Sequence, residues 1–303
     1  YVLIPIVLVP QLLFSGVIVN FNKLHKTISH PEFVPVVGDI MLSRWSYEAL
    51  CVQQFKTNKY NREFFDLNTQ LSNSNYNSSF LIPKLQSLVN EVSVDLTLSR
   101  KTPRIDKDLS IIRNEVSLLE ENFPIHGFSY PNTTFLYPET VNVDYLNITN
   151  QKLDTLKNHF NIVYREIIEK RDDKLKTLAV KLGSNDAVFE LSRNYHNKGV
   201  ENLVTNRNEI QKIEVVGDRL MRRYEPIYAI PSSKIGRAQL FAAYKRIGSI
   251  YISTFWFNLF AIWIMTGLFY FTLWSDMFRV VNKFVERFKF RKLTNRISRY
   301  LPS

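Results

Sequence analysis

The sequence predicts an all-α membrane protein, in which two transmembrane helices flank a mainly helical extracytoplasmic domain with one short extended or looped segment. Three observations carry this prediction. Two apolar segments, Tyr1 to Val19 and Tyr251 to Leu273, contain no Asp, Glu, Lys or Arg. The chain between them repeats apolar residues every three or four positions, which is the period of amphipathic helices. A basic cluster follows the second segment directly.

Each apolar segment is long enough for a membrane span, which needs roughly 20 mostly apolar residues. The second, assigned to residues 248–275, has aromatic residues near both ends and a basic flank, which is how spanning helices are anchored. The first, residues 1–19, begins without Met, so we expect a truncated helix of a longer protein. Pro5 and Pro10 each remove a backbone donor and predict kinks in it. A buried core helix of a soluble domain is the alternative for this segment.

The orientation follows from the C-terminal tail, residues 276–303. Eight basic residues against two acidic ones give this tail a net charge of +6, out of +11 for the whole chain. A basic cluster beside a span predicts a cytoplasmic tail that binds anionic lipid headgroups. Because no nucleic-acid recognition module accompanies the charge, we do not expect a polynucleotide partner. The middle of the chain is then extracytoplasmic, and the expected location is the inner membrane, with several passes.

The middle domain, residues 56–247, shows helical periodicity. The mean hydropathy of the whole chain is only −0.14, too low for a protein that lies entirely in the membrane. The expected helices run from Ser79 to Leu98, Asp106 to Asn122 and Thr149 to Leu182, with Gly183 and Ser184 capping the end of one helix and the start of the next. A final amphipathic stretch, Glu209 to Tyr224, continues this series. Residues 123–146 lack the period and predict an extended, looped or short hairpin segment. The charged run at 165–174 predicts a solvated helix face.

Residues for catalysis or metal binding do not form a recognisable pattern in this sequence. It has no Gly-rich phosphate loop of the GxxxxGK type and no HExxH motif, and Cys51 is its only cysteine. The five histidines are scattered without the spacing of metal ligands. We therefore expect no catalytic, cofactor-binding or metal site in these residues.

Residues 20–55 predict interfacial or re-entrant helices at the mouth of the membrane domain. This stretch contains the motif SRWSYEAL at 43–50, whose Arg, Trp and Tyr suit the headgroup layer. The candidate gating residues are Ser43, Arg44, Trp45, Tyr47 and Glu48. Arg44 and Glu48 are four residues apart, so they are expected to form an ion pair on one helix face, and direct contact with a substrate is the alternative.

The segment IPIVLVPQLLFSGVIV together with the SRWSYEAL motif resembles the ABC-2 type permease of ABCG-like transporters, near the end of its transmembrane domain. There the fifth membrane helix ends in a PQLLFSG-like segment, mouth helices follow, and a sixth helix and a short cytoplasmic tail close the domain. The resemblance covers Tyr1 to about Phe65 and Ala229 to about Phe278. The helical insert between them is far longer than the usual loop. The combination is most similar to large ATP-binding cassette proteins of Bacteroidetes-type bacteria.

The resemblance implies the C-terminal part of an exporter permease. ATP and Mg²⁺ would bind a nucleotide-binding cassette elsewhere in the full-length protein, and a second permease half, in a homodimer, would complete the path. The substrate is unidentified, and the family's broad class is amphipathic or lipid-like. A two-span membrane sensor with a helical ligand-binding domain is the alternative function, and a structural anchor whose insert docks an envelope partner is a third. The sensor predicts straight, proline-poor spans and a long domain after the second one.

Overall fold

The protein is mostly helical, as predicted. The computed structural model describes residues 3–16, 21, 33–100 and 102–275. In chain order the helices are α1 (Leu3–Leu13), α2 (Val36–Ile40), α3 (Leu42–Thr57), α4 (Asn61–Tyr76), α5 (Ile82–Thr97), α6 (Pro103–Asn122), α7 (Val143–Leu182), α8 (Asn185–Tyr195), α9 (Lys198–Thr205) and α10 (Thr254–Trp274). Two antiparallel hairpins, β1 (Ile213–Val216) with β2 (Arg219–Arg222) and β3 (Tyr244–Ile247) with β4 (Ile250–Ser253), lie between α9 and α10.

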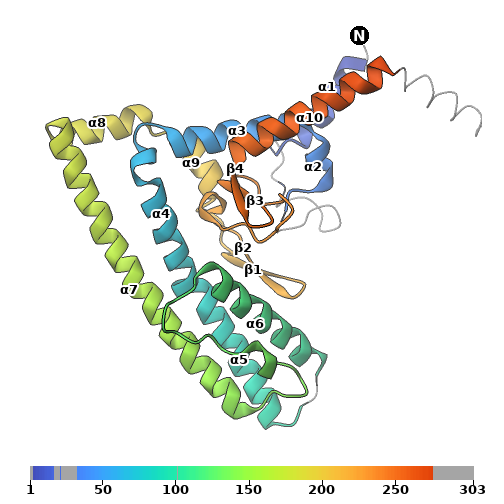
Figure 1. Ribbon diagram of the computed structural model, residues 1–303, viewed down its shortest axis with the longest axis vertical. Helices are drawn as coiled ribbons and strands as arrows, with labels where there is room; N and C mark the ends of the chain where they lie inside the picture. The colour runs from blue at the N-terminus through green and yellow to red at the C-terminus, as the bar shows by residue number, and fades with distance from the viewer. Residues whose placement is uncertain (1–2, 17–20, 22–32, 101, 276–303) are drawn as a thin grey trace, which may run out of the picture.

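A long helical arm extends away from α10 (Figure 1). Its first half is a continuous rod in which a π-helical turn, Asn77–Leu81, joins α4 to α5. Pro83 stands in the first turn of α5, and a proline ring crowds the carbonyl four residues earlier. The wider π-turn just before it relieves that crowding. The 40-residue helix α7 packs back along both α4 and α5.

The core of the arm is formed by the apolar faces that the periodicity predicts. In α5 and α6 the apolar residues recur every three or four positions and are almost completely buried, and α7 adds a matching row. Fully buried members are Ile82, Leu85, Leu109, Ile112, Val116, Leu146 and Leu153. Beyond Ile167 this helix is mostly exposed, and seven of the ten residues of the charged run at 165–174 face solvent. The prediction of a solvated face is therefore confirmed.

A second, smaller core lies in the base of the molecule, close to α10. There α3, α4 and α9 pack against a 3-10 turn, Pro226–Tyr228, and the segment leading into β3. Its buried members are Cys51, Val52, Phe55, Phe65, Val204, Ile227, Tyr228, Phe241 and Ala243. The packing of α3 along α10 is the most extensive contact between two elements in the described chain.

The amphipathic stretch from Glu209 to Tyr224 is not a helix, and its place in the helical series was wrong. It holds the β1–β2 hairpin, whose strands pair Ile213 with Arg222 and Val216 with Arg219. Gly217 has a φ of 61°, a conformation that favours glycine and suits a two-residue hairpin turn. The Gly-Asp pair between two runs of β-branched and long apolar residues is the signal for this turn.

The ends of the arm helices agree with the predicted caps in part. Gly183 ends α7 with a φ of 92°, and the hydroxyl of Ser184 accepts a hydrogen bond from the amide of Ala187 at the start of α8. Helix α7 starts earlier than expected, because Asn142 caps it through the amide of Tyr145. The preceding segment, residues 123–142, is looped with one 3-10 turn.

Within the residues that the structure describes, α10 is the one helix both long and apolar enough to cross a membrane. Its large side chains are mostly exposed, Trp263 by 72% and Trp274 by 75%, as expected for a surface that faces something other than water. β4 occupies Ile250–Ser253, so the helix begins at Thr254, six residues after the predicted start of the span at 248. The first predicted span stays a prediction, because α1 covers 11 residues and 17–20 lie outside the description. The basic tail, residues 276–303, also lies outside it.

Candidate functional site

The SRWSYEAL motif forms the first half of α3, beside α10. Met41 adopts an extended conformation that separates α2 from α3, so the two helices meet at an angle. The hydroxyl of Ser43 donates to the main-chain oxygen of Gln11 at 2.6 Å, and the main-chain amide of Ser43 donates to Oε1 of the same glutamine at 3.2 Å. These bonds attach the start of α3 to α1, the helix that contains Pro5 and Pro10.

The predicted ion pair exists, and it is completely buried. Nη1 of Arg44 lies 2.8 Å from Oε2 of Glu48, and both side chains have no exposed surface. The other guanidinium nitrogens are also used: Nη2 donates to Asp39 at 2.6 Å and Nε to the carbonyl of Gly38 at 3.3 Å. The guanidinium of Arg44 therefore has no exposed surface with which to contact lipid headgroups directly. It is enclosed by α2 and α3.

Two residues from distant parts of the chain complete the cluster. Nζ of Lys245, on β3, donates to Oε2 of Glu48 at 2.9 Å, and Nδ2 of Asn258, in the second turn of α10, donates to the same oxygen at 2.8 Å. Lys245 is 3% exposed and Asn258 is fully buried. One carboxylate oxygen thus accepts hydrogen bonds from α3, β3 and α10. We call Asp39, Arg44, Glu48, Lys245 and Asn258 the buried ionic cluster.

The enclosed charges of the cluster are unequal in number, because Arg44 and Lys245 are both buried cations and Glu48 is the one fully buried anion among the cluster's residues. Burial alone would raise the pKa of Glu48, but the Coulombic attraction of Lys245 and Arg44 outweighs it and holds this pKa below its ordinary value. Burial lowers the pKa of Lys245 and of Arg44 in spite of the same carboxylate. Two cations therefore share one fully enclosed anion, and the partly exposed Asp39 supplies the second negative charge.

Two hydrogen-bond acceptors in the cluster have no donor in the described part of the chain: Oε1 of Glu48 and Oδ1 of Asn258. Leaving a buried acceptor without a partner costs free energy, of the order of 1–3 kcal/mol. Both atoms belong to side chains that already bind each other through a different pair of atoms. Neither of the two unpartnered atoms takes part in the ion pairs of the cluster, which all use Oε2 of Glu48 or the carboxylate of Asp39.

Aromatic side chains of the motif close the cluster. Trp45 stacks on Phe257 of α10 with ring centroids 6.1 Å apart, and its indole nitrogen donates to the carbonyl of Asp39 at 2.8 Å. The guanidinium of Arg44 lies 3.4 Å from the centre of the same indole. Tyr47 points to the opposite side and packs edge-on against Phe241 in the core of the base. The aromatic residues thus pack within the protein and connect α3 to α10.

The structure brings together Arg44, Trp45 and Glu48 among the predicted residues, and places Ser43 and Tyr47 on either side. Sequence reasoning missed Asp39, Lys245 and Asn258. Asn258 had a signal, since a polar amide inside an apolar span is expensive unless it has a partner. Lys245 follows the apolar run Phe241–Tyr244 but is not otherwise distinctive. No group of three or more residues able to hold a metal ion occurs in the described residues.

Fold and site together define a class: a mostly helical protein in which, among the described residues, the one helix long and apolar enough to cross a membrane is joined by a buried ionic cluster to α2, α3 and β3. Comparison with protein-family models, with curated proteins and with solved structures finds no match to this chain.

Proposed function

We propose that this chain is the C-terminal part of the permease domain of an ATP-driven ABC-2 type exporter in the inner membrane. In this proposal α1 and α10 are the fifth and sixth membrane helices, α2 and α3 cap the outer mouth, and the arm is extracytoplasmic. ATP binds a cassette elsewhere in the full-length protein, and a second permease half completes the path for an amphipathic substrate.

The observation that carries the proposal is the hydrogen bond from Asn258 to Glu48, with Lys245 on the same oxygen. It joins the membrane helix α10 to the mouth helix α3 and to β3 at one point. Such a junction is stiff, because its members are buried and each bond is charge-assisted. A tilt of α10 is then passed to α3 instead of being absorbed by a loop. This is the mechanical requirement of a transporter that alternates between two states.

The proposed orientation of the chain in the membrane can be tested first. Intact cells expressing the full-length protein, with Cys51 replaced by Ser, receive one new cysteine at Asp186 on α8 or at Ser298 in the tail. A membrane-impermeant maleimide should label position 186 in intact cells and position 298 only after permeabilisation. The opposite pattern would falsify the orientation and, with it, the exporter.

Coupling is tested with the full-length gene product in liposomes. Two spin labels, one on α7 and one near the end of α10, should change their distance when ATP is bound under non-hydrolysing conditions. Asn258→Leu should keep ATP hydrolysis but reduce the distance change, while Thr272→Val, on the exposed part of the same helix, serves as the matched control. Absence of ATPase activity, or an unchanged distance in the unmodified protein, contradicts the proposal.

A further inference from the structure

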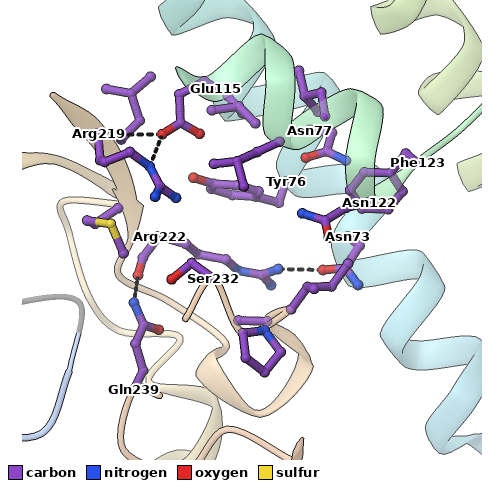
Figure 2. Close-up of a pocket in the computed structure, with 18 of the residues that line it drawn as sticks. Asn73, Tyr76, Asn77, Glu115, Asn122, Phe123, Arg219, Arg222, Ser232 and Gln239 are labelled. Atoms are coloured by element: carbon purple, nitrogen blue, oxygen red, sulfur yellow. Dashed lines mark hydrogen bonds and ion pairs between the residues drawn. The ribbon is translucent and has the colours of Figure 1, made fainter. Parts of the chain in front are cut away.

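The π-helical turn that joins α4 to α5 forms one wall of a cavity between the arm and the base (Figure 2). The cavity has a volume of about 120 Å³ and is lined by residues of α4, α6, β2 and the segment 229–242. In Figure 2, Asn73, Asn77 and Asn122 lie on one side and Arg219 on the other, while the guanidinium of Arg222 reaches across to Asn73. π-turns occur frequently at functional sites, which favours a ligand at this wall.

One donor in this wall has no partner. Asn77 is 2% exposed, and its Nδ2 makes no hydrogen bond within the described chain. An unsatisfied buried amide costs about as much as a lost hydrogen bond, and native proteins retain few of them. Because Asn77 starts the π-turn and lines the cavity, a group bound there is able to satisfy it. That group must be a hydrogen-bond acceptor.

The charged residues of the wall already have partners. Nε of Arg219 lies 3.0 Å from Glu115, and Nη2 of Arg222 lies 3.3 Å from Glu225, while Nη1 of Arg222 donates to Asn73 at 2.8 Å. A ligand with a net charge would therefore enter a largely apolar cavity without a free counter-ion, which is unfavourable. The acceptor is accordingly uncharged, such as the carbonyl of an ester or amide.

A second cavity, of about 630 Å³, adjoins the first and shares Asn73, Asn122, Phe123 and the segment 229–231 with it. Its other walls are mostly aromatic and aliphatic, and include Phe160, Val163, Tyr228, Tyr244 and Tyr251. This volume is within the usual range for small-molecule sites. Tyr251 lies three residues before α10, so the cavity is close to the start of the membrane helix.

We propose that the two cavities bind one uncharged amphiphile, whose carbonyl accepts a hydrogen bond from Nδ2 of Asn77 and whose apolar body lies along Phe123, Phe160 and Tyr228. The smaller cavity has room for about four water molecules or a headgroup of similar size. The larger one takes the apolar body. This site is independent of the exporter assignment, since it rests on the arm and the base alone.

The test uses the full chain in phosphatidylcholine nanodiscs and a monooleoylglycerol that carries a photoreactive diazirine in its acyl chain. Mass spectrometry of the labelled peptides should place the label in α7 near residues 159–163 and in the segment 227–231. Unlabelled monoolein should remove this label, oleate should be at least tenfold less effective, and glycerol should have no effect. Loss of the label on raising the phospholipid-to-protein ratio, at a fixed ratio of probe to phospholipid, would show that phospholipid occupies the site and would overturn the proposal.

Two variants test the geometry. Asn77→Leu removes the donor at nearly constant volume, and we expect at least tenfold weaker labelling with an unchanged or higher melting temperature of the unliganded protein. Ile230→Trp, in the shared wall, should abolish labelling by filling the space. Asn158→Leu, exposed on α7, should change neither property. Unchanged labelling in Asn77→Leu would show that its amide does not hold the ligand, and label confined to α10 would show that the amphiphile does not enter the cavities. Either result overturns the proposal.

Discussion

Nδ2 of Asn258 in α10 lies 2.8 Å from Oε2 of Glu48 in α3, and this contact joins positions 210 residues apart in the chain. The same oxygen accepts from Arg44 and Lys245. An enclosed carboxylate with two enclosed cations is stable only while all partners are present. Removing one of them leaves a buried charge without compensation.

Replacement of Glu48 by Gln should therefore strongly destabilise the protein. The change keeps the size of the side chain but leaves Arg44 and Lys245 buried with only Asp39 nearby. We expect the free energy of unfolding to fall by about 3–5 kcal/mol, measured by denaturation in detergent. The control is Glu190→Gln, because Glu190 is 64% exposed and pairs with Arg193 at the surface. It should cost less than about 1 kcal/mol. Equal losses in the two variants would contradict the role of the cluster.

The pH dependence of the free energy of unfolding should reflect the titration of Glu48. The pKa of Glu48 is lower in the folded protein than its ordinary value of 4.5. A carboxylate with a depressed folded pKa stabilises the fold above 4.5, and this contribution is lost as the pH falls through the folded pKa. Between pH 5 and strongly acidic conditions the unmodified protein should thus lose more stability than Glu48→Gln. Parallel curves for the two proteins would rule out Glu48 as the titrating group.

A separate contact holds the arm against the base near α10. Glu121, close to the end of α6, accepts a hydrogen bond from Arg246 of β3 at 2.8 Å and lies 3.2 Å from Lys234. Because Glu121 is 38% exposed, we expect little loss of global stability from Glu121→Lys. The reversed charge should instead broaden the distance distribution between spin labels on α6 and β3. Asp106→Lys, at the other end of α6, should leave that distribution narrow. An unchanged width in Glu121→Lys would show that the contact does not restrain the arm.

Gly236 should be the more sensitive of two glycines with positive φ. A Cβ atom at Gly236 (φ 80°) would lie 2.7 Å from the ring of Phe257, whereas Gly217 (φ 61°) has open space. Gly217→Ala should cost about 1–2 kcal/mol from backbone conformation alone. Gly236→Ala should cost at least about 1 kcal/mol more, because the ring must move from its stack on Trp45. Calorimetry of both variants measures the difference, and equal costs would mean that the ring adapts freely.

Features that depend on residues close together in the chain could be predicted from the sequence alone. Apolar spacing in α5, α6 and α7, the Ser184 cap and the Gly183 end of α7 all involve contacts within about one helical turn, and all were predictable. The Arg44–Glu48 pair belongs to this group. The hairpin at 213–222 was missed, because an amphipathic pattern over short strands is easily mistaken for part of a helix.

The partners of that pair and the depth of its burial depend on how remote segments pack together. Lys245 and Asn258 lie about 200 residues further along the chain, and no local pattern relates them to Glu48. The burial of the unpartnered amide of Asn77 likewise depends on β2 and the segment 229–242, which close the cavity. Helix formation is governed by near neighbours, whereas burial and charge pairing are set by the packing of segments that are remote in sequence.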